Sequence, residues 1–157
     1  MLCLSQTTGY AVHALVCLEE QGGHANLIRD IARCTGISKP YLARIINALA
    51  HHELVAAKRG YRGGIAMARP AGEISLLQVV EAVEGPNWIG PCLLGLDDCA
   101  APGVCPTHDV WQRVMGELKA VLGKTTLADV VASPARKQAL RRMKTRCSRL
   151  APRKAAA

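Results

Sequence analysis

Residues 27–51 read LIRDIARCTGISKPYLARIINALAH, and the fold can be inferred outward from this segment. Its first part repeats apolar side chains at the spacing of one helical face. This predicts a short helix over 27–34 with four side chains inward: Leu27, Ile28, Ile31 and Ala32. Thr35 and Gly36 then end the helix, because glycine tolerates the backbone conformation of a tight turn.

A second helix is predicted to follow that turn. Ser38 is placed to cap its N-terminus, and Pro40 is tolerated in a first turn. The apolar pattern then resumes with Leu42, Ile45, Ile46 and Leu49. A short helix, a glycine-containing turn and a second amphipathic helix form the order of a helix-turn-helix, whose second helix lies in the major groove of DNA.

The flanking segments extend this motif to a winged helix. Upstream, apolar residues at helical spacing predict a helix over 8–20, which Gly22 and Gly23 stop. Downstream, 54–58 and 65–68 are predicted strands around a basic, glycine-rich tip, and 75–84 forms a further amphipathic helix. The predicted fold class is therefore mainly α with a small β-hairpin wing.

A long helix is predicted over 107–122, after glycines and prolines keep 85–106 irregular. Its apolar stripe is too wide for one small neighbour: Val110, Trp111, Val114, Met115, Leu118, Val121 and Leu122. We therefore expect burial against a second copy, in a twofold homodimer. The predicted organisation is a winged helix-turn-helix over 1–84, a cysteine sensor loop over 85–106, a dimerisation helix with a terminal turn over 107–132, and a basic, disordered tail over 133–157.

Charge is distributed unevenly along the chain. The formal net charge is +8, but residues 134–157 alone carry nine basic and no acidic residues. Residues 27–69 hold eight basic and two acidic residues, whereas 70–133 hold three basic and eight acidic ones. The basic module favours a nucleic acid as its partner. No apolar run is long enough to cross a bilayer and no leader peptide is evident, so we expect a cytoplasmic protein without membrane contact.

The exposed face of the second motif helix supplies candidate contacts to double-stranded DNA. Arg44 and Asn47 are the candidate base readers, because arginine pairs bidentately with guanine and asparagine with adenine. The candidates for contacts to the DNA backbone or minor groove are Ser38, Lys39, Tyr41, Arg59 and Arg62. The alternative is a helical core with a solvated basic face, which leaves the order of helix, turn, helix and hairpin unexplained.

Three of the seven cysteines and one histidine follow the spacing Cys92-x6-Cys99-x5-Cys105-x2-His108. Three thiolates and an imidazole complete a four-ligand set, and sulfur ligands select zinc, copper(I) or iron-sulfur clusters. Structural zinc usually uses a tight Cys-x2-Cys pair, whereas these longer intervals leave room for a cluster. Cys105 and His108 fall at the start of the long helix, whose positive end favours thiolate. A histidine there is otherwise a cap or a surface residue.

These elements resemble those of one family, the bacterial winged-helix regulators that include the iron-sulfur cluster regulator IscR and the nitric-oxide-sensitive repressor NsrR. The similarity runs from about residue 4 to residue 132. It rests on the order of seven motifs: Gly9-Tyr10-Ala11-Val12, Gly36-Ile37-Ser38, Tyr41-Leu42, Leu54-Val55, Arg59-Gly60-x-x-Gly63-Gly64, Cys105-Pro106-Thr107-His108-x-x-Trp111 and Thr126-Leu127-Ala128-Asp129.

The resemblance implies a homodimeric transcription regulator, most simply a repressor, whose operator affinity changes when an iron-sulfur cluster is lost, oxidised or nitrosylated. The family's three cluster thiolates fall on Cys92, Cys99 and Cys105, and the histidine ligand of IscR-like members falls on His108. A 2Fe-2S cluster is expected in preference to a 4Fe-4S cluster. An enzyme is not expected, because no phosphate-binding glycine loop, nucleophile elbow or Cys-x-x-Cys redox pair occurs.

The chain departs from the family pattern in three places. Thr8 and Gly9 stand where NsrR-like members offer a carboxylate ligand, so such a ligand is not expected. The first cysteine interval is six residues instead of five, and Ala43 replaces a carboxylate on the recognition helix of IscR. Cluster type and operator sequence therefore stay open. Two other hypotheses for the loop also stay open: a thiol switch that forms a disulfide on oxidation, and a structural zinc site.

Overall fold

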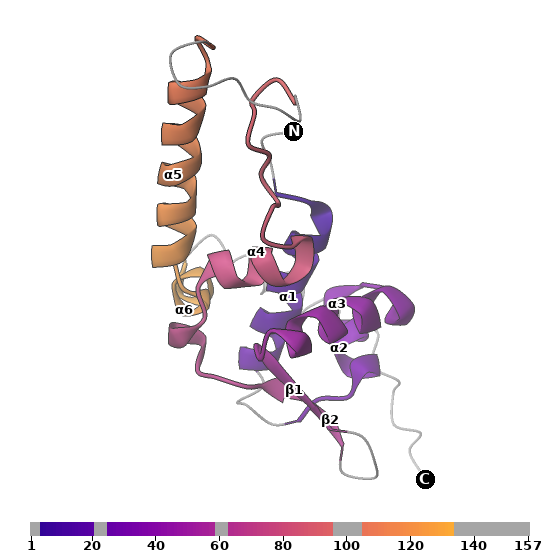
Figure 1. Ribbon diagram of the computed structural model, residues 1–157. Helices are drawn as coiled ribbons and strands as arrows, with labels where there is room; N and C mark the ends of the chain where they lie inside the picture. Colours follow the sequence, from indigo (N-terminus) through magenta and orange to yellow (C-terminus); the bar gives the residue numbers. More distant parts are fainter. Residues whose placement is uncertain (1–3, 21–24, 59–62, 96–104, 134–157) are drawn as a thin grey trace, which may run out of the picture.

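The computed structural model describes residues 4–20, 25–58, 63–95 and 105–133. Its elements, in chain order, are α1 (Gln6–Glu20), α2 (Ile28–Thr35), α3 (Lys39–His51), β1 (Val55–Lys58), β2 (Gly64–Met67), the 3-10 turn η1 (Ala71–Glu73), α4 (Leu76–Glu84), α5 (His108–Lys124) and α6 (Leu127–Ala132) (Figure 1). This mainly helical chain with one antiparallel hairpin confirms the predicted winged helix-turn-helix fold class. Among the described residues, no helix is long and apolar enough to cross a membrane.

Helices α1, α2 and α3 share one apolar core. The large side chains that they bury fully include Leu15, Leu18, Ile31, Leu42 and Leu49. Each helix turns its apolar face to this core, and burial of that surface holds the three helices together. Gly36 ends α2 with a φ of +74°, the left-handed conformation predicted for the turn.

The prediction placed both ends of α2 one residue too early, since the helix runs from Ile28 to Thr35, and it wrongly put Leu27 inward. Leu27 precedes the helix with extended backbone (φ −75°, ψ 144°) and is 40% exposed. Ile31 and Ala32 are buried as predicted, and Ile28 packs against the core. The N-cap residue lies outside the helical repeat, so its side chain does not follow the inner face.

The hairpin is fixed to the helices by a contact that the sequence did not predict. β1 and β2 pair with Val55 opposite Met67 and Lys58 opposite Gly64. Asn26 and Ile65 exchange two backbone hydrogen bonds, each 2.8 Å long. This bridge brings the backbone so close that a Cβ at Gly64 would lie 2.9 Å from the Cβ of Ala25. Glycine is therefore required at position 64. The tip, residues 59–62, lies outside the described residues.

α4 and α6 begin next to each other, although α5 separates them in sequence. Each begins with a capping box, Ser75 with Gln78 and Thr126 with Asp129. The Leu76 N–H donates to the Thr125 carbonyl at 2.9 Å, and the Leu127 N–H donates to the Ile74 carbonyl at 2.8 Å. Leu127 is fully buried. The chain thus leaves the core after α4 and returns to it after α5.

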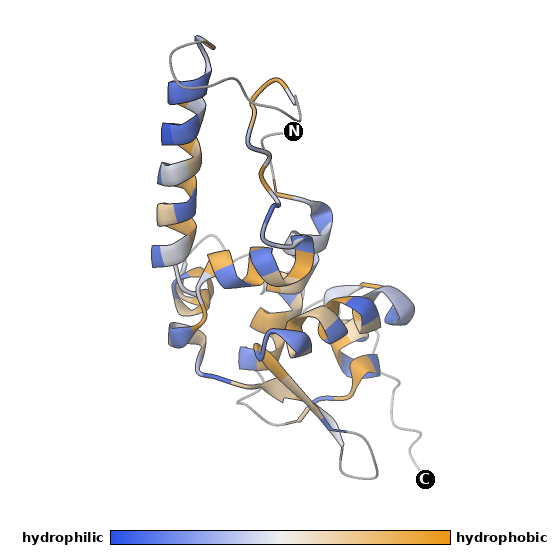
Figure 2. Cartoon of the chain, in the orientation of Figure 1, coloured by the Kyte–Doolittle hydropathy of each residue, from blue (hydrophilic) through white to orange (hydrophobic). Residues whose placement is uncertain are grey.

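α5 extends away from the helical body (Figure 1) and carries two apolar faces. The inner face buries Trp111 and Leu122. The second face exposes three valines, which we call the valine face: Val110 at 48%, Val114 at 39% and Val121 at 60%. Figure 2 shows hydrophobic and hydrophilic stretches alternating along this helix. Nothing in the described part of the chain covers the valine face.

Candidate functional site

The polar face of α3 is open to solvent, as a DNA-reading helix requires. Lys39, Arg44 and Asn47 are exposed. Ser38 is also exposed and occupies the N-cap position, but its side chain makes no capping hydrogen bond. Its carbonyl accepts from the Leu42 N–H at 2.9 Å instead. The predicted side-chain cap is therefore wrong, and the hydroxyl of Ser38 does not cap α3.

Tyr41 faces α1, in contrast to its exposed neighbours on α3. It is half-buried, its hydroxyl forms a 2.5 Å hydrogen bond with Thr7 Oγ1, and its ring meets the ring of Tyr10 edge to face, with centroids 5.9 Å apart. The helical repeat placed Tyr41 on the polar side. In the fold it joins the reading helix to the first turns of α1.

The elements that pack against α3 also carry exposed basic side chains. Lys58 of β1 is exposed, as are Arg29 and Arg33 of α2. The two α2 arginines lie 3.9 and 3.8 Å from Asp30, contacts that carry little stability at a solvated surface. The predicted wing contacts Arg59 and Arg62 lie outside the described residues.

The predicted sensor loop begins where Gly85, at φ +86°, ends α4. Cys92 is buried in the following segment, 86–95. Cys99 lies outside the described residues, and the chain is described again from Cys105, just before α5. Among the described residues, no three His, Cys, Asp or Glu side chains lie close enough together to hold a metal ion. Cys105 and His108 are thus neighbours at the start of α5, but Cys92 does not form a three-ligand group with them.

The thiol of Cys105 sits in a polar turn. Its Sγ lies 3.2 Å from Thr107 Oγ1, and the His108 N–H donates to the Cys105 carbonyl at 3.1 Å. Hydrogen bonds from the Thr107 side chain, then from the backbone of Thr107 and of His108, lower the pKa of the Cys105 thiol. His108 is half-buried as the first residue of α5. The start of α5 therefore favours the thiolate, the form that binds metals and reacts with oxidants.

Glu84, the last residue of α4, is held by the beginning of α1. Thr8 Oγ1 donates to Glu84 Oε1, and the Ser5 N–H donates to the same oxygen at 3.1 Å. Burial by itself raises the pKa of Glu84, but the hydrogen bonds from Thr8 and Ser5 outweigh it and lower the pKa. No local sequence pattern indicates this contact, because Thr8 and Glu84 are 76 positions apart.

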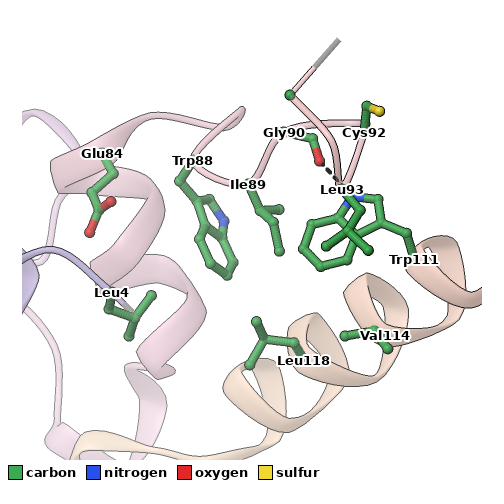
Figure 3. A pocket seen from close by; sticks show the side chains of 11 residues that line it. Leu4, Glu84, Trp88, Ile89, Gly90, Cys92, Leu93, Trp111, Val114 and Leu118 are labelled. Carbon is green, nitrogen blue, oxygen red and sulfur yellow. Dashed lines mark hydrogen bonds between the residues drawn. The ribbon is translucent and has the colours of Figure 1, made fainter. Parts of the chain in front are cut away.

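A cavity of about 330 Å³ lies between the 86–95 segment and α5 (Figure 3). Both tryptophans of the chain line it. Trp111 Nε1 donates to the Gly90 carbonyl at 3.0 Å, whereas Trp88 Nε1 is buried and no acceptor for it occurs within the described part of the chain. Glu84 forms one wall. Cys92 lies at the rim, and Figure 3 shows its sulfur directed away from the other lining side chains.

Comparisons with known proteins point to one family. The model of the Rrf2 family, described as an iron-dependent transcriptional regulator, matches residues 4–133. The HTH-type transcriptional regulator IscR of Cronobacter sakazakii is 33% identical over 124 residues, covering 78% of this chain and 75% of that protein. The structure of T. potens IscR matches with a TM-score of 0.66 at 28% identity, covering 85% and 90%. CymR, the global cysteine regulator of B. subtilis, matches in fold with a TM-score of 0.67 at 23% identity, covering 84% and 98%.

Proposed function

The chain belongs to the Rrf2 family of transcriptional regulators, and from this premise we propose that it is a repressor whose affinity for its DNA operator is set by an iron-sulfur cluster. Membership of the family makes the protein a DNA-binding transcriptional regulator and not an enzyme, as the sequence predicted. The cluster, its ligands and the sign of regulation are proposals that go further.

The observation that carries the cluster is the environment of Cys105. Thr107 and the backbone at the start of α5 lower the pKa of this thiol, and His108 follows within the same turn. Metal ligation requires deprotonated thiols and neutral imidazole. Cys92 and Cys99 complete a donor set whose chemistry fits a 2Fe-2S cluster, so we assign Cys92, Cys99 and Cys105 as ligands and His108 as the fourth. Such a cluster would supply one-electron redox chemistry and reactivity toward oxygen or nitric oxide.

The test is to purify the full chain without oxygen and to record its visible spectrum with iron and acid-labile sulfide. We expect visible bands and matching amounts of iron and sulfide. Replacement of Cys92, Cys99 or Cys105 by serine should remove the bands and change operator affinity, whereas Cys17→Ala, a buried cysteine of α1, should keep both. His108→Ala should shift the bands if His108 is a ligand. A protein that stays colourless after reconstitution, with unchanged operator binding in the cysteine variants, would refute the cluster.

A thiol switch is the second candidate function for the loop, and the same lowered pKa of Cys105 favours it. In that case, mild oxidant should lower the intact mass by two hydrogens, reversibly, in a protein that holds no iron. A structural zinc site would instead give zinc and no iron on metal analysis, with no response to oxidant.

The proposed contacts to DNA fall into two groups, to base edges and to the DNA backbone. The dependence of binding affinity on DNA sequence and on salt distinguishes them. Arg44 and Asn47, exposed on α3, would read base edges. The proposed backbone and minor-groove contacts are Ser38, Lys39, Tyr41, Arg59 and Arg62. Arg44→Ala should reduce the binding free energy for the operator by about 1 to 3 kcal/mol and relax sequence specificity. Lys39→Ala should instead weaken binding to all DNA sequences alike and reduce the slope of log affinity against log salt concentration by about 1. Fluorescence anisotropy on an operator selected from random DNA measures both, and equal effects of the two variants would contradict the division.

We further propose a cytoplasmic homodimer joined through α5. The support is the valine face, Val110, Val114 and Val121, on a helix that extends from the body of its own chain. In this proposal residues 1–84 read DNA, 85–106 sense the signal and 107–132 form the dimer. The tail proposed over 133–157 lies outside the described residues after Ser133.

A further inference from the structure

The cavity beneath the 86–95 segment has one of the proposed cluster ligands, Cys92, at its rim. Its apolar walls are the side chains of Leu4, Ile89, Leu93, Leu118 and Val114, which also belongs to the valine face, together with the two indoles; the sulfur of Cys92 is turned away from them (Figure 3). A volume of about 330 Å³ is within the range of small-molecule sites. Since one water occupies ~30 Å³ of liquid volume, the space suits a molecule of about a dozen heavy atoms.

One donor in this cavity has no partner among the described residues. Trp88 Nε1 is buried, and no acceptor reaches it within the described residues, whereas Trp111 Nε1, in the same cavity, is bonded to Gly90 at 3.0 Å. A buried N–H left without an acceptor is costly, so a ligand that supplies one gains more than an exposed hydrogen bond would give. Figure 3 shows the nitrogen on the side of the Trp88 ring that faces Ile89 and Trp111.

The charge of the wall selects against anions. Glu84 lines the cavity, and its hydrogen bonds with Thr8 and Ser5 stabilise the carboxylate. An anionic ligand would be repelled at close range in surroundings that are mostly apolar. The remaining walls offer apolar surface and aromatic rings, which favour a flat apolar body.

We propose that this cavity binds a compact, uncharged, largely apolar molecule whose carbonyl or similar acceptor bonds to Trp88 Nε1. Such a ligand would contact the 88–93 segment, α5 and, through Leu4, the beginning of α1. It is a second site, which shares only Cys92, at its rim, with the proposed cluster.

Three probes of nearly the same shape test the proposal: 2-acetylnaphthalene, 2-isopropenylnaphthalene, which replaces the carbonyl by an apolar group, and 2-naphthoate, which is charged. Each is titrated into the full chain labelled with nitrogen-15, while the two indole N–H signals are followed by NMR. We expect the acetyl probe to bind about five- to tenfold more tightly than the isopropenyl probe, because a net hydrogen bond is worth about that ratio. It should shift the Trp88 signal downfield, and naphthoate should bind most weakly.

The two tryptophans supply a matched pair of variants. Trp88→Phe keeps an aromatic wall but removes the free donor, so the acetyl and isopropenyl probes should bind it equally. Trp111→Phe alters the same cavity but removes a donor that is already bonded. The ratio of the binding affinities of the acetyl and isopropenyl probes should therefore persist. Absence of binding by all three probes, including the case in which a partner subunit fills the cavity, would overturn the proposal. So would a ratio that survives Trp88→Phe. Operator binding and iron content, measured on the same samples, separate these outcomes from a failure of the proposed regulator.

Discussion

Two consecutive residues of α1 connect it to two different helices. The hydroxyl of Thr7 pairs with Tyr41 on the reading helix, and the hydroxyl of Thr8 donates to Glu84 at the end of α4. Thr8 is fully buried, so its hydrogen bond replaces water that the hydroxyl has lost. The residue before the proposed sensor loop and the helix proposed to read DNA are therefore held by neighbouring side chains.

Glu84→Gln should destabilise the protein at neutral pH by about 1 kcal/mol, a value reduced for partial exposure. The pKa of Glu84 is lowered in the folded state, so its carboxylate contributes stability above the unfolded pKa, and that contribution is lost as the pH falls through the folded pKa. The variant and the parent should therefore converge in acid, at a pH below the ordinary glutamate value of 4.5. Urea unfolding at several pH values measures this. Glu81→Gln, one turn earlier on α4, is the control, and a pH-independent difference for Glu84→Gln would contradict the assignment.

Among the secondary-structure elements, the N-terminal ends of the helices are stabilised in different ways. α4 and α6 begin with complete capping boxes, and their first turns exchange backbone hydrogen bonds. α3 begins with a serine whose side chain does not cap. The hairpin depends on a bridge to Asn26 and on a glycine at position 64. Local sequence therefore determines the start of α4, while tertiary packing holds α3 and the wing.

Ser75→Ala and Ser38→Ala should have opposite consequences. Ser75 Oγ accepts from the Gln78 N–H at 3.2 Å, so its removal should cost about 1 kcal/mol of stability with little effect on operator affinity. Ser38→Ala removes no capping bond and should leave stability nearly unchanged, while weakening binding if Ser38 contacts DNA as proposed. Thermal unfolding and anisotropy on the same samples check both. Equal loss of stability in the two variants would be inconsistent with this distinction.

Gly64→Ala should detach the wing from the 25–26 segment. The added Cβ would meet the carbonyl carbon and the Cβ of Ala25, both at 2.9 Å, and the backbone must shift at a cost of about 1 to 3 kcal/mol. Gly72→Ala is the control, because a Cβ there meets nothing within 4 Å. Hydrogen exchange at the Ile65 amide, which donates to Asn26, reports on the bridge. Unchanged protection in Gly64→Ala would show that the wing is anchored in another way.

Taken as a whole, the molecule is a compact helical body from which one helix, α5, extends. α5 leaves the core after α4, and α6 returns the chain to it at Leu127. Trp111 and Leu122 face the chain's own body, whereas the valine face has no cover within the described residues. A helix with apolar residues on two sides is best stabilised by two neighbours, and in the proposed homodimer the second neighbour is the partner subunit.

Val121→Asp should convert the proposed dimer to a monomer at micromolar concentration. Val121 is 60% exposed, so the carboxylate costs little in the isolated chain but would be buried without a partner in the dimer. Operator affinity should fall at least tenfold, because one reading head is then lost from a two-site complex. Lys119→Asp, roughly opposite Val121 on the helix, should stay dimeric. Light scattering after gel filtration decides, and a Val121→Asp dimer would place the interface elsewhere.

The sequence by itself determined the parts that repeat locally. The apolar spacing from Leu42 to Leu49, the glycine at position 36 and the two short runs around the basic, glycine-rich tip indicate helix, turn, helix and wing, because helical periodicity and left-handed turns depend on near neighbours. The cysteine spacing and the motifs around it likewise indicated the family, which the comparisons confirm.

Only the tertiary structure decided contacts between distant positions. It paired Thr8 with Glu84, turned Tyr41 toward Thr7 and away from solvent, and brought Asn26 to the wing. It also divided the apolar stripe of α5 into an inner face and a valine face, and left Trp88 Nε1 without an acceptor in the described part of the chain. A local pattern can say that a side chain is apolar or polar, but its partner depends on which surfaces the packed helices bring together.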